Sequence, residues 1–176
     1  SIFYFNFKKE KKIISSEIVE EEIVEKENYT SSNILKNVKY TAQDINGNQL
    51  MIEAEEGEID FNNNDVIFLK KVTALITMVK DNEKIKIISE YGKYNTVNYD
   101  TIFSKNVKID YLDNKITSNY LDFSMIENKL IISKNVVYTN LENILKADVI
   151  ELNTITKDTK IFMHNSKSKV IIKSRD

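Results

Sequence analysis

The chain has 176 residues, with 25 Lys and Arg, 27 Asp and Glu, one His, and no Cys, Pro or Trp. This length suits one domain with an ordinary hydrophobic core and excludes a large multidomain enzyme. Without cysteine, disulfide scaffolds, zinc ribbons and catalytic thiols are excluded. The formal charge of −2 and the single arginine, Arg175, give no basic footprint for phosphate backbones, so we expect no nucleic-acid partner.

Residues 1–7 consist mainly of large apolar and aromatic side chains, and a lysine cluster follows at 8–12. Crossing a bilayer takes about 20 apolar residues, so this stretch cannot do so alone. It is either the last part of a membrane anchor that lies mostly before Ser1, or an apolar first strand. Because apolar residues followed directly by lysines are typical of a membrane exit, we expect the end of an anchor here.

Residues 8–33 form a segment of mostly Lys, Glu and Ser, in which the apolar pairs Ile13/Ile14, Ile18/Val19 and Ile23/Val24 recur every five residues. On a helix each five-residue step rotates by about 140°, so these pairs would not share one face. We therefore interpret 8–33 as a charged connector, extended or loosely helical, and 34–176 as the folded domain.

From residue 34 onward, short apolar-polar alternations rich in Ile, Val, Tyr, Phe and Thr are separated by Asn, Asp, Gly and Lys clusters. Such alternation predicts β-strands, and the clusters predict tight turns. Seven turns, and hence about eight or more strands, are predicted at 46–48, 62–65, 81–83, 98–100, 113–115, 127–129 and 141–143.

Two short patterns repeat along this domain. The first is Lys-(Asn/Lys)-Val, which ends at Val38, Val72, Val107 and Val136, with steps of 34, 35 and 29 residues. The second centres on a small residue, with an aliphatic residue two positions earlier and further apolar or glycine positions three and five residues later. Its small residues are Ala54, Ser89, Ser118 and Ala147.

The second pattern changes parity, because side chains alternate between the two faces of a strand and offsets −2 and +3 would point to opposite faces. We therefore expect a bulge or sharp bend just after each small residue, which returns both sets to one interior. Each unit is then a bent strand, a turn and a straighter strand. The fold class predicted is all-β: a folded-over antiparallel sheet built from repeated two-strand units, with 160–173 as a degenerate last copy and an open edge.

No recognised catalytic motif occurs in the sequence. His164 stands alone, which makes a zinc site improbable, and acidic runs such as Glu55/Glu56 are typical of solvated faces. We therefore predict no enzyme activity, no metal site and no cofactor.

The interior of the folded sheet is then the candidate site. Its residues are either a filled core or the lining of a groove for an apolar ligand, and patterning does not separate the two. The predicted lining residues are Phe68, Val72, Phe103, Val107, Ile109, Leu121, Phe123, Ile132, Val136, Tyr138, Ile150 and Leu152.

The run from Val38 to Gly57 resembles the opening of the periplasmic domain of the LptC family of lipopolysaccharide-export proteins. Gly92-Lys93-Tyr94-Asn95, the Lys-Asn-Val strands and Leu145-Lys146-Ala147-Asp148 are similar to later strands of that domain and of the wider OstA-like superfamily. The resemblance covers about residues 35–173. The apolar start and charged connector suit LptC better than the soluble bridge protein LptA, and that choice stays open.

This resemblance implies a twisted antiparallel β-jellyroll in the periplasm, anchored in the inner membrane by a segment before or overlapping 1–7. It implies that the interior receives the acyl chains of lipopolysaccharide from the membrane subunits of an ABC transporter and passes the lipid to a soluble LptA-like bridge protein. The bridge would dock by strand addition at the C-terminal edge. We place that edge at Ile161, Phe162, Met163, Val170 and Ile172. The alternative is a structural β-solenoid or assembly module with a filled core and edge-to-edge self-association.

Overall fold

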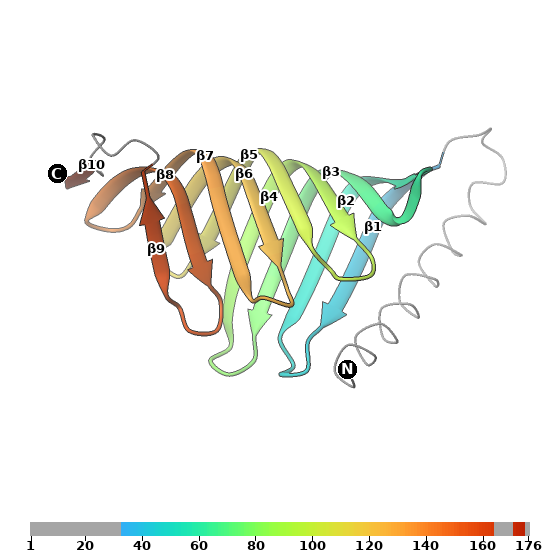
Figure 1. The fold of residues 1–176 in the computed structure, drawn as a ribbon, viewed down its shortest axis with the longest axis horizontal. Coiled ribbons are helices and arrows are strands. Elements are labelled where there is room, and N and C mark those ends of the chain that lie inside the picture. Colours follow the sequence, from blue (N-terminus) through green and yellow to red (C-terminus); the bar gives the residue numbers. More distant parts are fainter. Residues whose placement is uncertain (1–32, 164–170, 175–176) are drawn as a thin grey trace.

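A computed structural model of the chain describes residues 33–163 and the backbone of 171–174 (Figure 1). The predicted anchor at 1–7 and nearly all of the connector at 8–33 lie outside these residues. None of the described segments is a helix of the length and apolarity needed to cross a membrane.

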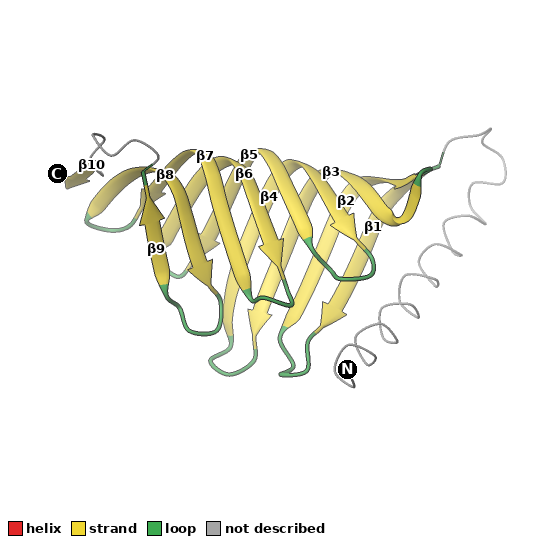
Figure 2. Ribbon diagram, viewed as in Figure 1, coloured by secondary structure: helices red, strands yellow, loops and turns green. Residues whose placement is uncertain are grey.

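The described chain forms ten strands in one antiparallel sheet (Figure 2), as the alternating pattern predicted. The strands are β1 (Ile34–Gln43), β2 (Gln49–Asp60), β3 (Asn63–Met78), β4 (Glu83–Asn95), β5 (Thr101–Tyr111), β6 (Asn114–Ser124), β7 (Lys129–Thr139), β8 (Asn143–Asn153), β9 (Thr159–Phe162) and β10 (Ile171–Ser174). Strands β1 to β8 pair in sequence order, and the predicted turns lie between them.

The last position of the sheet is shared by two short strands. β9 pairs with β8 at Val149–Leu152, and β10 pairs with β8 at Asn143–Lys146. The two therefore follow the same edge of β8, one on each side of its middle. This matches the prediction that the C-terminal stretch is a degenerate copy of the repeat.

Each of the strands β1 to β8 changes direction near its middle, and these bends fold the sheet onto itself. We call the row of bends the fold line. The first wall is the half of the sheet that ends in the turns 44–48, 79–82, 112–113 and 140–142. The second wall is the half that ends in the turns 61–62, 96–100, 125–128 and 154–158.

In the even-numbered strands the bend follows the small residue, as predicted. The pairing register shifts next to Ser89, Ser118 and Ala147. The parity change is also confirmed at the first small residue, because Ala54 and Gly57 are both buried although they are three residues apart.

The odd-numbered strands are not the straighter strands that the repeat suggested, because they bend at Lys-(Asn/Lys)-Val. β1 and β3 each have one residue in the left-handed region, Asn37 and Lys71, both at φ 52°. β5 and β7 each have two, Lys105 and Asn106 in β5 and Lys134 and Asn135 in β7. Asparagine is among the few residue types that adopt this region readily, which explains its place in the pattern.

The prediction that Phe68 lines the interior is wrong, and the number of left-handed residues in each bend explains why. In β5, with two such residues, the buried Phe103 and Val107 are four apart. In β3, with one, the buried residues on either side of the bend are Leu69 and Val72, three apart. Phe68, four residues before Val72, therefore points outward and is 44% exposed.

We expect Asn135→Val to lower the free energy of unfolding by about 1 kcal/mol or more, because a β-branched residue is strained at the positive φ of this position. Asn135→Gly is the control and should cost little, since glycine adopts this region freely. Urea denaturation of the two variants measures the difference. Equal losses would show that the backbone at Asn135 does not determine the bend.

Candidate functional site

The interior of the folded sheet brings together most of the predicted lining residues. Tyr138 is partly buried and packs against the core, and Phe68 lies outside. The buried ones are Val72, Phe103, Val107, Ile109, Leu121, Phe123, Ile132, Val136, Ile150 and Leu152. They belong to a single cluster that also contains residues from the first strands, among them Leu50 and Ile52. Their assignment to a lipid groove stays a prediction.

The two walls pack directly against each other. Tyr40 of the first wall and Tyr94 of the second wall have ring centroids 5.2 Å apart, and both rings are almost completely buried. Phe103 and Leu121 have no exposed surface at all. Because solvent does not reach these side chains, the described interior is a filled core in this structure rather than an open groove.

Two glycines allow the walls to close near the fold line. A Cβ atom at Gly57 would lie 3.2 Å from a methyl group of Val38, and one at Gly92 would lie 3.1 Å from a methyl group of Val72. Both contacts are tighter than ordinary packing, so the valines of the Lys-(Asn/Lys)-Val pattern fit because the glycines carry no side chain. Leu121 and Ile150 take the equivalent places in the later repeats.

The cluster that fills the interior consists of apolar side chains and tyrosines. Burial, and then the neighbouring Tyr99 and Tyr40, raise the pKa of Tyr94 well above its ordinary value. Tyr94 is therefore neutral at physiological pH. Within the described residues, no group of three or more His, Cys, Asp or Glu is placed to hold a metal ion. His164 lies outside those residues.

At the mouth, opposite the fold line, a polar cluster joins the two walls. Lys157, in the turn after β8 of the second wall, has its Nζ 2.9 Å from Glu83 Oε2 and 3.6 Å from Asp81 Oδ2, both of the first wall. Tyr111 of β5 donates a hydrogen bond to Glu83, and the Lys157 ammonium lies 5.4 Å from the centre of the Tyr111 ring. The ion pairs of Lys157 therefore connect the two walls.

The charges of this cluster stabilise one another. The hydrogen bond from Tyr111, and then the one from Lys157, lower the pKa of the Glu83 carboxyl. Burial acts to lower the pKa of Lys157, but its bonds to Glu83 and Tyr111 outweigh burial and raise it. Both groups are therefore ionised near neutral pH. The sequence analysis missed this cluster, because no repeat or motif tells which turns meet across the mouth.

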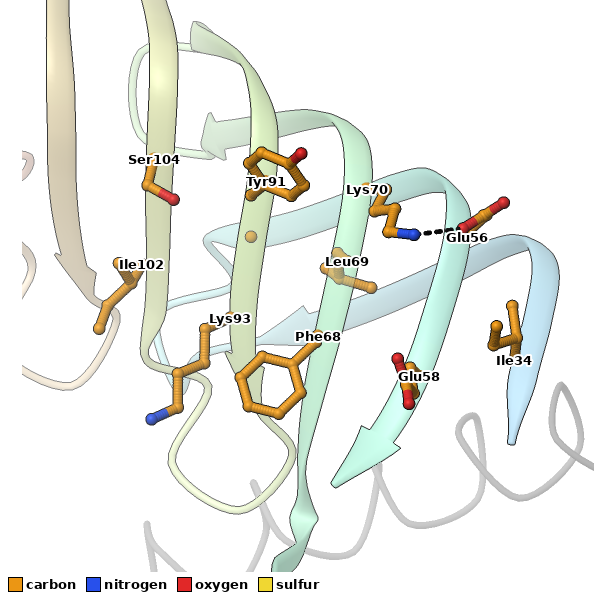
Figure 3. Close-up of a pocket in the computed structure, with 11 residues that line it drawn as sticks. Ile34, Glu56, Glu58, Phe68, Leu69, Lys70, Tyr91, Lys93, Ile102 and Ser104 are labelled. Atoms are coloured by element: carbon orange, nitrogen blue, oxygen red, sulfur yellow. Dashed lines mark ion pairs between the residues drawn. The ribbon is translucent and has the colours of Figure 1, made fainter. Parts of the chain in front are cut away.

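The outer face carries a hollow of about 380 Å³ in which the outward Phe68 lies (Figure 3). Phe68, Tyr91 and Ile102 contribute apolar surface, and the ion pair between Lys70 and Glu56 lies at one side. Hydrogen bonds from Lys36 and Lys70 lower the pKa of Glu56 to about 2. This hollow is on the opposite side of the sheet from the interior.

The predicted docking edge is only partly described. Ile161 and Phe162 lie in β9 with exposed side chains, and Met163 packs against the core. Ile172 lies in β10 opposite Leu145, and Val170 is outside the described residues. Docking of a partner at this edge stays a prediction.

Comparison with solved structures shows a similar fold. The chain matches the crystal structure of LptH from Pseudomonas aeruginosa, described as the LptA-homologous periplasmic component of the lipopolysaccharide transport device, with a TM-score of 0.53. The match has 9% sequence identity and covers 72% of this chain and 94% of that one. No protein-family model matches the chain, and no curated protein matches it. At this identity the comparison supports the LptA-like β-jellyroll fold that the resemblance implied.

We expect Leu121→Ala to lower the free energy of unfolding by about 2–5 kcal/mol, because a filled interior cannot hydrate the cavity that the substitution leaves. Leu141→Ala, in an exposed turn, is the control and should change little. Chemical denaturation measures both. A loss at Leu121 no larger than at Leu141 would contradict a filled interior.

We expect Glu83→Gln to destabilise the protein at neutral pH and progressively less as the pH falls below 4.5. The folded-state pKa of Glu83 lies below its ordinary value of 4.5, so its stabilising contribution is complete above that pH and is lost as the pH falls through the lowered value. Denaturation midpoints of wild type and variant between pH 7 and about 3 measure this, with Glu142→Gln as the control. A pH-independent difference would show that the carboxylate charge is not the stabilising feature.

Proposed function

We propose that this chain carries lipopolysaccharide by its acyl chains, in the periplasm, as a component of a lipopolysaccharide export system. The observation that carries this proposal is that the apolar face of one long sheet is folded into a single interior, in the fold of LptH. Each methylene buried in such an interior contributes roughly 0.8 kcal/mol, which makes an acyl chain a well-matched ligand. No bond is made or broken in this role.

Within such a system we assign the chain the LptC-like role of a carrier tethered at the inner membrane. The apolar residues 1–7 and the charged connector 8–33 support this assignment, together with the resemblance of residues 35–173 to LptC. The carrier would receive lipopolysaccharide from the membrane subunits of an ABC transporter and pass it to a soluble LptA-like bridge protein. The exposed strand β9 offers that partner an edge for strand addition.

Because the interior is filled, an acyl chain has to enter between walls that now touch each other. The contacts that it replaces are apolar contacts such as those around Phe103 and Leu121, for which methylene groups are a chemical substitute. The lipid-bound state is therefore one in which the walls separate and the acyl chain takes the place of the opposite wall.

We expect a photoreactive phenylalanine derivative at Phe103 to form adducts with lipopolysaccharide. The same derivative at Phe68 is a matched control, since both phenylalanines lie on the second wall but on opposite faces of the sheet. The exposed Lys108 is a second outward position. Gel shifts after irradiation measure the adducts. Adducts at Phe68 and Lys108 as strong as at Phe103, or no adduct at any position in a folded sample, would contradict the carrier.

A second candidate function, a structural assembly module, is favoured by the filled interior itself. In this function the core never opens, and copies join through the edge strands β1 and β9. It predicts oligomers that grow with protein concentration in the absence of any lipid, which analytical ultracentrifugation measures. Concentration-dependent oligomers together with an absence of adducts at Phe103 would favour this module over the carrier.

A further inference from the structure

A hollow of about 380 Å³ lies at the mouth between the walls. Its lining comes from the first-wall turns 44–48 and 79–82 and from the second-wall turn 154–158. Met78, which contributes to the lining, is also a buried member of the hydrophobic core. Val79 and Ile155 line it from opposite walls and are about half exposed. The hollow is therefore an apolar depression that borders on the core.

Lys157 lines the same hollow and forms the ion pairs with Asp81 and Glu83 that connect the walls. The turn that presents it is well ordered by its own hydrogen bonds: the Asn153 side chain accepts bonds from the backbone N–H groups of Ile155 and Thr156, both at 2.9 Å. Figure 1 shows this turn, between β8 and β9, on the same rim of the molecule as the turn between β3 and β4.

We propose that this hollow is the side entrance through which an acyl chain of an anionic amphiphile reaches the interior, and that the ion pairs of Lys157 are its latch. The inference rests on the proposed function. In the empty protein Lys157 holds Asp81 and Glu83 and keeps the walls together. During uptake the anionic headgroup takes the place of these carboxylates on Lys157, and the acyl chain passes between Val79 and Ile155 onto Met78.

The charges at the mouth fit this exchange. Lys80 and Lys157 both line the hollow, together with the carboxylate of Asp81. Lys80 is in none of the ion pairs among the described residues, so once Lys157 exchanges partners an anionic headgroup meets two cations there. The Lys157 side chain is 31% exposed, but its Nζ atom is covered from solvent, so an anionic headgroup reaches that atom only as the walls begin to separate. Separation of the walls at this point breaks no strand pairing, because neither turn is hydrogen-bonded to the other through the sheet.

The absence of native cysteine allows the entrance to be locked. In the full chain, Val79→Cys with Ile155→Cys, joined by a bifunctional maleimide, ties the walls together and leaves Lys157, Asp81 and Glu83 in place. Ile45→Cys with Val79→Cys is the matched control, since it joins two exposed residues of first-wall turns. Monofunctional maleimide on the first pair controls for added bulk.

The measurement is adduct formation between purified lipopolysaccharide and a photoreactive residue at Phe103. We expect the lock across the mouth to remove most of the adducts, because the tied walls cannot separate, and both controls to keep them. Equal adducts in locked and control proteins would overturn the side entrance while the carrier function stands. An absence of adducts in the unlocked protein would overturn the carrier function itself.

The variant Lys157→Met tests whether the ion pairs of Lys157 control the entry of the acyl chain or only stabilise the fold. It should speed the capture of an uncharged amphiphile, dodecyl maltoside, because the latch is gone, and slow the capture of lipopolysaccharide, because the headgroup loses its cation. Lys129→Met is the matched control, since Lys129 forms an equally exposed ion pair with Glu151, 3.4 Å long, within the second wall alone. Changes of the same sign for both amphiphiles, or equal changes in Lys129→Met, would contradict the exchange at Lys157.

Discussion

The left-handed backbone at the middle of β1, β3, β5 and β7 is the constraint on which the rest of the structure depends. A flat sheet of these strands would expose its apolar face to water, whereas a sheet bent along the fold line buries that face against itself. The energetic cost of residues such as Lys71 and Asn106 in the left-handed region is therefore offset by the burial of both walls. Gly57 and Gly92 make the closure tight where the valines of the pattern meet them.

In a folded sheet of this kind the two walls are joined covalently at the fold line, and they are easier to separate at the mouth. Near the fold line, each strand runs on from one wall to the other, and its pairing with the neighbouring strands resumes on both sides of the bend. Away from the fold line, the walls meet through side chains alone: buried ones such as Tyr40 and Tyr94 in the interior, and the ion pairs of Lys157 at the mouth. Motion that separates the walls would therefore begin at the mouth. This asymmetry lets one structure be a filled core when empty and, as we propose, a container when loaded.

Much of this fold could be predicted from the sequence, because turn residues and the parity change at Ala54, Ser89, Ser118 and Ala147 are local signals. Phe68 was placed on the wrong face because the number of left-handed residues in a bend is not visible in the pattern Lys-(Asn/Lys)-Val. The contact of Lys157 with Asp81 and Glu83 was missed for a different reason. It depends on how the strands tilt in the two walls, which is a property of the whole sheet and not of any segment.

The central claim is that the two walls separate to hold an acyl chain, and a distance across the mouth tests it most directly. Spin labels at Lys84 of the first wall and Lys160 of the second, both exposed, can be attached through single cysteines because the chain has none of its own. Pulsed electron paramagnetic resonance then gives the separation with and without lipopolysaccharide. The account predicts a longer distance in the lipid-bound sample. An unchanged distance in a sample with lipid demonstrably bound would contradict it.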